Sequence, residues 1–316
     1  MVVMSFSSRV KDELSRQCPV ARHCQIAEIA AIISLCGRVQ ISENGRYMVK
    51  IHTENIAVAR KYFTLLKKTY NIDAEISIRR SSSANLYTVA VKNHEAALKV
   101  LKASKLVDSS GEIYENLSVS DNLIIQKECC KRAFIRGAFL ASGSISAPEK
   151  FYHFEIVCST ESKALQLKNI IACFDIDAKI VERKRHFVVY VKESSGIVDI
   201  LNVMEAHVSL MDLENVRILK EMRNSVNRKV NCETANLNKT VSAAVKQIED
   251  IRYIESTKGL SVLSEGLEEI ARLRLENPDS SLKELGEMLS VPVGKSGVNH
   301  RLRKISNIAD DLRNKK

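Results

Sequence analysis

Two stretches of the chain show the same order of hydrophobic and polar positions, about 105 residues apart. In each copy, apolar residues recur over the length of a helix, and later alternate with polar residues as in a strand. The predicted helices are 26–37, 55–70 and 95–103 in the first copy, and 132–143, 162–174 and 197–204 in the second. The strand-like runs are 47–52 and 86–91, and 152–157 and 186–191, with the matching segments 71–76 and 175–180 before each closing hairpin. This order predicts a tandem α+β repeat.

The opening helix of each copy ends in a glycine, Gly37 in the first and Gly143 in the second. Glycine tolerates the left-handed conformation that commonly follows the C-terminus of a helix. We therefore expect both glycines to end their helices in this way.

The last fifty residues have a helical periodicity with two breaks. An amphipathic helix over 267–276 is stopped by 277–279, and a capping box formed by Ser281 and Glu284 starts a second helix. That helix continues through Leu289, with Gly286 leaving room for close packing, and 291–294 ends it. A third helix begins near Ser296. Three short helices with a tight second connection match the helix-turn-helix pattern.

The third helix carries Val298, Leu302 and Ile305 on one face and polar side chains on the other. Asparagine pairs with adenine and arginine with guanine in a major groove, while lysine and serine contact phosphates. The residues expected to contact DNA are Ser281, Lys283, Lys295, Ser296, Asn299, His300, Arg303 and Lys304. A three-helix module that binds another protein is the alternative.

Charge supports a polyanionic partner. The 316 residues include 48 Lys and Arg against 38 Asp and Glu, a net charge of +10, and 45% are hydrophobic. Residues 216–316 hold 19 basic and 14 acidic residues, so the positive excess is about twice as dense there as in 1–215, with 29 and 24. Such an excess favours nucleic acid first and an anionic membrane surface second. The longest apolar stretch, 26–36, contains Glu28 and is too short to span a bilayer, and no signal peptide is found, so we expect an intracellular protein.

Eight cysteines are spread along the chain, and we expect them to be reduced. Cys18, Cys24 and Cys36 lie near the start, close to His23, and no C-x-x-C pair occurs. Isolated thiols are usually small core hydrophobes. We therefore expect neither a metal site nor a cofactor.

The repeat resembles the LAGLIDADG homing-endonuclease fold, with 29–37 and 135–143 matching the two copies of the motif. The resemblance implies a pseudo-dyad at which two helices approach closely over a saddle-shaped sheet face that grips DNA. Their small residues are Ala30, Ala31, Gly137 and Ala138. The acids that hold catalytic metal ions in the family correspond to Cys36 and Ser142, and neither 29–42 nor 129–147 contains Asp or Glu. We expect no catalytic residue and no nuclease activity, with a metal-dependent DNA endonuclease as the alternative.

The whole chain resembles the WhiA family of Gram-positive bacteria. The matching segments are SFSSRVKDELS at 5–15, CCKRAFIRGAFL at 129–140, NRKVNCETAN at 227–236, SLKELG at 281–286 and GKSGVNHRLR at 294–303. The resemblance implies a DNA-binding regulator linked to cell division, chromosome segregation or sporulation, in the cytoplasm and associated with the nucleoid. Its expected partner is double-stranded DNA, with other transcription factors or RNA polymerase as further candidates and no membrane.

The expected organisation has three parts. They are a LAGLIDADG-like domain over 1–204 with repeats at about 26–103 and 131–204, a helical connector over 205–259, and a helix-turn-helix domain over 260–316. A pocket left by the lost catalytic acids could also sense a small ligand, although no motif supports this third hypothesis.

Overall fold

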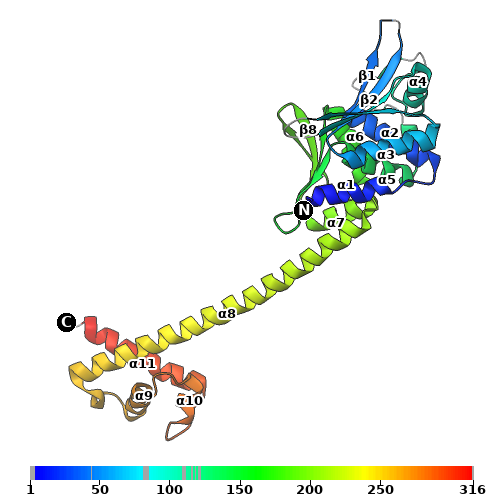
Figure 1. Ribbon diagram of the computed structural model, residues 1–316. Coiled ribbons are helices and arrows are strands. Elements are labelled where there is room, and N and C mark those ends of the chain that lie inside the picture. Colours follow the sequence, from blue (N-terminus) through cyan, green and yellow to red (C-terminus); the bar gives the residue numbers. More distant parts are fainter. Residues whose placement is uncertain are drawn as a thin grey trace. The chain divides into compact units, whose positions relative to one another are not determined.

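The computed structural model describes residues 4–43, 45–80, 85–108, 112–114, 117, 119 and 122–314. The chain divides into two compact units, Met1–Lys220 and Glu221–Lys316 (Figure 1). The division falls inside the predicted connector, within the single long helix α8 (His207–Lys258).

The N-terminal unit is an α+β domain that contains the predicted repeat. The first copy comprises α2 (Arg22–Cys36), β1 (Gly37–Ile41), β2 (Tyr47–Thr53), α3 (Ile56–Tyr70), β3 (Glu75–Arg80), β4 (Asn85–Val91) and α4 (His94–Ala103). The second comprises α5 (Glu128–Ser142), β5 (Gly143–Ile145), β6 (Phe154–Cys158), α6 (Glu161–Ala172), β7 (Lys179–Arg183), β8 (His186–Val191) and α7 (Ser194–Val203). Each copy forms one antiparallel sheet, in the order β1-β2-β4-β3 or β5-β6-β8-β7. The predicted order of elements is confirmed, although the hydrophobic pattern did not predict β1 and β5.

Among the described residues, this unit also contains elements outside the two repeats. The helix α1 (Phe6–Arg16) buries Phe6, Val10 and Leu14, and the short 3-10 helix η2 (Asn122–Ile125) precedes α5. The carboxylate of Glu13 in α1 accepts hydrogen bonds from the backbone N–H groups of Val208 and Ser209, at 2.8 and 2.9 Å. Because a helix N-terminus has unpaired N–H groups and a positive dipole end, this carboxylate stabilises the start of α8.

The helices α2 and α5, one from each copy, pack together at the centre of this unit (Figure 1). Their contact requires small side chains: a Cβ atom at Gly137 would lie 2.6 Å from the carbonyl oxygen of Glu28 and 3.0 Å from the Cβ of Ala31. Ala30, Ala31 and Ala138 are completely buried. The prediction that small residues allow this close approach is confirmed.

A buried ion cluster crosses the same helix pair. The carboxylate of Glu28 in α2 has no solvent exposure and lies 3.1 Å from the ammonium of Lys61 in α3 and 3.5 Å from the guanidinium of Arg136 in α5. Arg136 also pairs with Glu205 at 2.6 Å. Burial raises the pKa of Glu28 and lowers that of Lys61, while the ion pairs oppose both shifts. The cluster therefore links the two copies at a buried position, where a charged group without an oppositely charged partner would destabilise the fold.

The expectation for the two helix-ending glycines was wrong. Gly37 and Gly143 are extended, with φ of −82° and ψ of 156° and 155°, because α2 and α5 run directly into β1 and β5. A Cβ atom at Gly37 would lie 2.4 Å from the carbonyl oxygen of Ile33, and one at Gly143 would lie 2.3 Å from Cδ2 of Phe139. Glycine is needed for this close approach rather than for a left-handed turn.

The C-terminal unit is all helical. Beyond the end of α8 it contains the 3-10 helix η3 (Leu260–Val262), α9 (Glu265–Glu276), α10 (Leu282–Glu287) and α11 (Lys295–Asn314). Its core includes Ile251 and Ile254 at the end of α8, so part of the predicted connector packs with the three C-terminal helices. Among the described residues, no helix combines the length and apolar character needed to cross a membrane.

Candidate nucleic-acid interface

The helices α10 and α11 are joined by a seven-residue turn, 288–294. We predicted that the second helix would continue through Leu289, but α10 ends at Glu287. The backbone N–H of Val293 donates to the carbonyl of Gly286 at 3.1 Å, and that of Ser290 donates to the carboxylate of Glu269 at 2.6 Å. These bonds turn the chain back across α10, while Leu289 stays buried.

Gly286 allows this turn to pass so close to α10. A Cβ atom at this position would lie 2.1 Å from the carbonyl oxygen of Val293 and 3.0 Å from a methyl group of Val298. The predicted role of Gly286 in close packing is therefore confirmed, because a side chain at this position would contact both the turn and α11.

The predicted capping box is also present at the start of α10. The hydroxyl of Ser281 accepts a hydrogen bond from the N–H of Glu284 at 3.3 Å, and the N–H of Ser281 donates to the Glu284 carboxylate at 2.7 Å. These bonds lower the pKa of Glu284. Ser281 is exposed, but its hydroxyl already caps the helix. Lys283, also exposed, lies 3.8 Å from the carboxylate of Glu287.

The helix α11 separates an apolar face from a basic one. Val298, Leu302, Ile305 and Ala309 are buried against the core, and the helix starts at Lys295, one residue earlier than predicted. The opposite side carries the remaining predicted residues. Lys295, Ser296, His300, Arg303 and Lys304 are exposed and Asn299 is partly buried. The helix thus brings together six of the eight predicted residues, and Ser281 and Lys283 stand on α10.

The basic residues of α11 divide into structural and free groups. Arg301 donates to the carbonyl of Gly266 in α9 at 3.4 Å, and Arg313 pairs at 2.8 Å with Asp250, a buried residue of α8. Among the described residues, Lys295, Arg303 and Lys304 have no acidic partner. The positive potential of this face is therefore not neutralised from within the unit.

Sequence reasoning missed two residues of this region. Asn307 is exposed one turn after Arg303, and the spacing of four residues from it could have placed Asn307 on the same face. Arg274 of α9 reads as a surface cation but is buried, donating to the carbonyl of Ser280 at 2.7 Å and to the side-chain oxygen of Gln247 at 3.2 Å. No local signal distinguishes it, because its partners lie on other segments.

The outer face of the first sheet carries a second group of cations. Val49 and Ile51 of β2 point into the core, so Lys50 and Arg38, its register partner on β1, lie on the opposite face. Burial lowers the pKa of His52 on the same strand, and these two cations lower it further. Two cations on neighbouring strands give this face a positive charge.

The corresponding face of the second sheet centres on a carboxylate. Glu155 accepts hydrogen bonds from Ser144 at 3.0 Å and Arg183 at 3.3 Å, and His153 lies 3.0 Å away. Partial burial acts to raise the pKa of Glu155, but these three partners outweigh it and hold that pKa below its usual value. The second face therefore holds a paired carboxylate at the position where the first face carries two cations.

At Cys36 and Ser142, where the resemblance to homing endonucleases implies catalytic acids, the side chains are neutral and hydrogen-bonded to the backbone. The thiol of Cys36 donates to the carbonyl of Ile32 at 3.2 Å, and the hydroxyl of Ser142 donates to that of Val157 at 2.8 Å. Burial raises the pKa of Cys36 to about 12, although Lys11 nearby acts in the opposite direction. Neither side chain offers the anionic oxygen that Mg²⁺ prefers.

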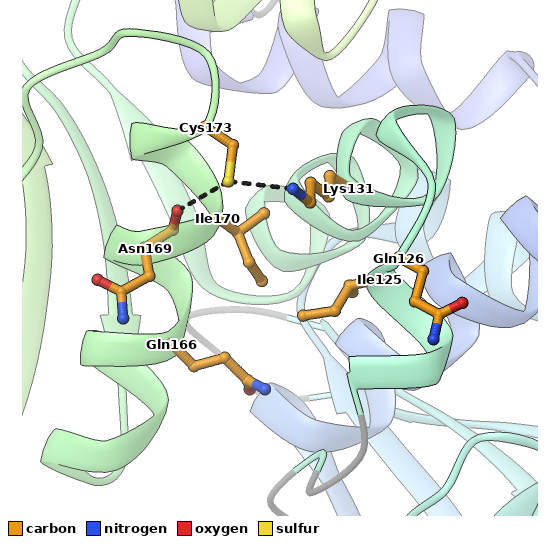
Figure 2. Close-up of a pocket in the computed structure, with 7 residues that line it drawn as sticks. All are labelled: Ile125, Gln126, Lys131, Gln166, Asn169, Ile170 and Cys173. Carbon is orange, nitrogen blue, oxygen red and sulfur yellow. Dashed lines mark hydrogen bonds between the residues drawn. The ribbon is translucent and has the colours of Figure 1, made fainter.

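A surface cavity of about 450 Å³ lies between α6 and the segment that joins η2 to α5 (Figure 2). Its polar lining residues include Gln126, Gln166 and Asn169, and Lys131 donates across it to the sulfur of Cys173 at 3.1 Å. Cys36 and Ser142 are not among its lining residues. This cavity is therefore not a pocket left by the lost acids.

Three family models together cover most of the chain. They are the WhiA N-terminal LAGLIDADG-like domain at 22–107, the WhiA LAGLIDADG-like domain at 131–223 and the WhiA C-terminal HTH domain at 226–309. The chain is 57% identical to a protein of Lachnoclostridium phytofermentans named "Probable cell division protein WhiA", over 98% of this chain and 100% of the relative. It is 49% identical to a protein of the same name from Alkaliphilus oremlandii, over 98% of each. The crystal structure of full-length WhiA from Thermatoga maritima matches with a TM-score of 0.61 and 24% identity, over 98% of this chain and 99% of that one.

Proposed function

Because the chain belongs to the WhiA family, we propose that it is a sequence-dependent DNA-binding regulator of cell division whose helix α11 enters the major groove. The observation that carries this proposal is the exposed face of α11, where Lys295, Arg303 and Lys304 have no acidic partner within the part of the chain that the structure describes. A solvated basic face is common on helices, but here it lies on the second helix of a helix-turn-helix. Roles in chromosome segregation and sporulation belong to the same proposal.

The residues of α11 divide by chemistry. Arg303 presents a planar guanidinium suited to O6 and N7 of guanine, and Asn299 presents an amide suited to N6 and N7 of adenine. Lys295 and Ser296 lie at the helix N-terminus, where backbone N–H groups add to their attraction for a phosphate. His300 and Lys304 lie on the same exposed side and complete the contact surface.

The N-terminal unit has a binding role in this proposal, and it does not cleave DNA. Arg38 and Lys50 on the outer face of the first sheet can contact phosphates or an acidic surface of a partner such as RNA polymerase. Hydrolysis of a phosphodiester requires carboxylates that hold metal ions beside the reacting oxygens. The neutral, hydrogen-bonded side chains of Cys36 and Ser142 support the absence of this chemistry.

The recognition helix can be tested by binding of the full chain to DNA sites found by chromatin immunoprecipitation with sequencing. Replacing Arg303 or Asn299 with Ala should weaken binding by about 1–3 kcal/mol per base contact and relax the preference at one base pair. Arg303→Lys keeps the charge but loses the bidentate geometry, so it should lose preference while retaining affinity for non-specific DNA. Arg16→Ala, which removes an exposed arginine of the N-terminal unit, is the matched control. Unchanged affinity and sequence preference in the Arg303 and Asn299 variants would show that α11 does not read bases.

Two further measurements separate the alternatives. Incubation of supercoiled plasmid with purified protein and Mg²⁺ should leave the plasmid intact, whereas persistent nicking would establish an endonuclease. A protein-interaction module would bind DNA weakly and without sequence preference, and modest salt would abolish that binding. The proposed regulator retains its preference for its own sites under the same salt.

A further inference from the structure

Four potential metal ligands meet at the N-terminal ends of the central helices. His23 and Cys24 lie in the first turn of α2, and Cys129 and Cys130 lie in the first turn of α5. Their ligand atoms all lie within 4.8 Å of one another. Among the described residues, this is the one group of three or more His, Cys, Asp or Glu arranged closely enough to hold a metal ion.

The distances within this cluster match the size of a tetrahedral zinc site. The Nδ1 atom of His23 lies 3.1 Å from the sulfur of Cys130, 3.3 Å from that of Cys24 and 4.0 Å from that of Cys129. Bond lengths of about 2.3 Å to sulfur and about 2.0 Å to nitrogen place tetrahedral N and S ligands about 3.5 Å apart. One ring nitrogen therefore faces three sulfurs at spacings that need only small shifts to surround one Zn²⁺ ion.

The internal repeat explains why the four residues meet. Gly37 and Gly143, which end the two opening helices, are 106 positions apart, and the same offset carries His23 to Cys129 and Cys24 to Cys130. Because α2 and α5 pack against each other as equivalent elements of the two copies, their equivalent first turns come together. Each copy supplies two adjacent ligands rather than a spaced pair. A search of the sequence for a C-x-x-C pair therefore does not find this group.

The donor set and its surroundings favour zinc. Three thiols and one imidazole form a Cys₃His set, which suits Zn²⁺ and is unsuited to Mg²⁺ or Ca²⁺, both of which require oxygen ligands. Two of the three sulfurs, those of Cys24 and Cys130, are buried, which limits the access of solvent to that side of the site. Twelve residues of helix, a rise of about 18 Å, separate Cys24 from Cys36, so this cluster is distinct from the position of the family's catalytic acids.

We propose that His23, Cys24, Cys129 and Cys130 bind one structural Zn²⁺ ion that joins α2 to α5. Cys24 and Cys130 are buried, and His23 and Cys129 are exposed, so the ion lies at the surface end of the helix pair and is accessible to solvent. The ion cross-links two segments that are more than a hundred residues apart in the chain, and its binding energy adds to the stability of the folded domain. This role is independent of DNA recognition by α11.

Metal content of the full chain is the first test, after purification under reducing, anaerobic conditions and removal of any affinity tag. Elemental analysis should find about one zinc per chain in the wild type and in Cys173→Ser, which removes an exposed cysteine outside the cluster. Replacing zinc with Co²⁺ should produce the visible d–d bands and near-ultraviolet thiolate bands of tetrahedral coordination. Cys129→Ser and His23→Ala alter exposed side chains and should weaken zinc binding by at least about tenfold in a chelator competition.

Alkylation of the wild type provides a second test that does not depend on the folding of a variant. Cys129 and Cys173 are both exposed, so without a metal ion both should react quickly with an alkylating reagent. With zinc bound, Cys129 should be protected until a chelator is added, while Cys173 reacts at the same rate throughout. Sub-stoichiometric zinc without the cobalt thiolate bands, or equal reactivity of both thiols in zinc-loaded protein, would overturn the proposal. A Cys24–Cys129 or Cys129–Cys130 disulfide that persists in the native protein after purification under reducing conditions would overturn it as well.

Discussion

Replacing Gly286 with Ala should disrupt the turn that positions α11. The new Cβ atom would lie 2.1 Å from the carbonyl oxygen of Val293, whereas such contacts normally exceed about 3.3 Å. The turn must therefore move by about 1 Å, which strains the packing at a cost of about 1–3 kcal/mol and weakens the Val293–Gly286 hydrogen bond, worth about 1 kcal/mol. The higher helix propensity of alanine returns about 1 kcal/mol, so the net loss is about 1–3 kcal/mol.

The assay combines hydrogen exchange with DNA binding of the full chain. Amide exchange in α10 and α11 should accelerate, while exchange in the N-terminal unit stays at the wild-type rate, and affinity for a specific DNA site should fall because α11 is displaced. Gly266→Ala is the matched control, since a Cβ atom there meets only the guanidinium of Arg301, at 3.7 Å, an ordinary van der Waals distance. If Gly286→Ala exchanged and bound DNA like Gly266→Ala, the close contact of α10 with the turn would not set the position of α11.

Three further predictions concern the central helices and the basic face. Gly137→Ala should destabilise the N-terminal unit by about 1–3 kcal/mol in chemical denaturation, because its Cβ atom would lie 2.6 Å from the carbonyl oxygen of Glu28. A variant as stable as the wild type would contradict the observed helix contact. Glu28→Gln removes the carboxylate beside the buried Lys61 and leaves Arg136 with Glu205 alone, so it should cost about 3–5 kcal/mol in the same assay. A neutral or stabilising effect would show that the ion cluster is dispensable. Lys295→Ala should lower the slope of log affinity against log salt by about one without changing the preferred DNA sequence, and an unchanged slope would mean that Lys295 contacts no phosphate.

The elements of both units were predictable because their signals are local. The alternation of helical and strand periods placed the helices and central strands of the two copies, and the reciprocal bonds of Ser281 and Glu284 lie within four residues. The basic face of α11 was predictable for the same reason. Its residues follow one helical period, and their exposure depends mainly on which side carries Val298 and Leu302.

The predictions that were wrong or incomplete depend on contacts between distant segments. Gly37 and Gly143 resemble ordinary helix-ending glycines, but their extended backbones result from direct entry into β1 and β5. The early end of α10 follows from the bond between Ser290 and Glu269, which lies on another helix. Arg274 is buried for a similar reason, since its partners belong to α8 and to the loop after α9.

The sequence by itself determined the repeated α+β order, the helix-turn-helix pattern and the placement of the positive charge, because each depends on periodicity or short-range spacing. Only the tertiary structure decided which distant side chains share a site. The packing of α2 against α5 buries Glu28 beside Lys61 and Arg136, and at the end of the same helices it brings His23 and Cys24 to the two cysteines at 129–130. Both clusters join residues that are far apart along the chain, and only the close approach of the two helices brings their atoms within ion-pair or hydrogen-bond distance.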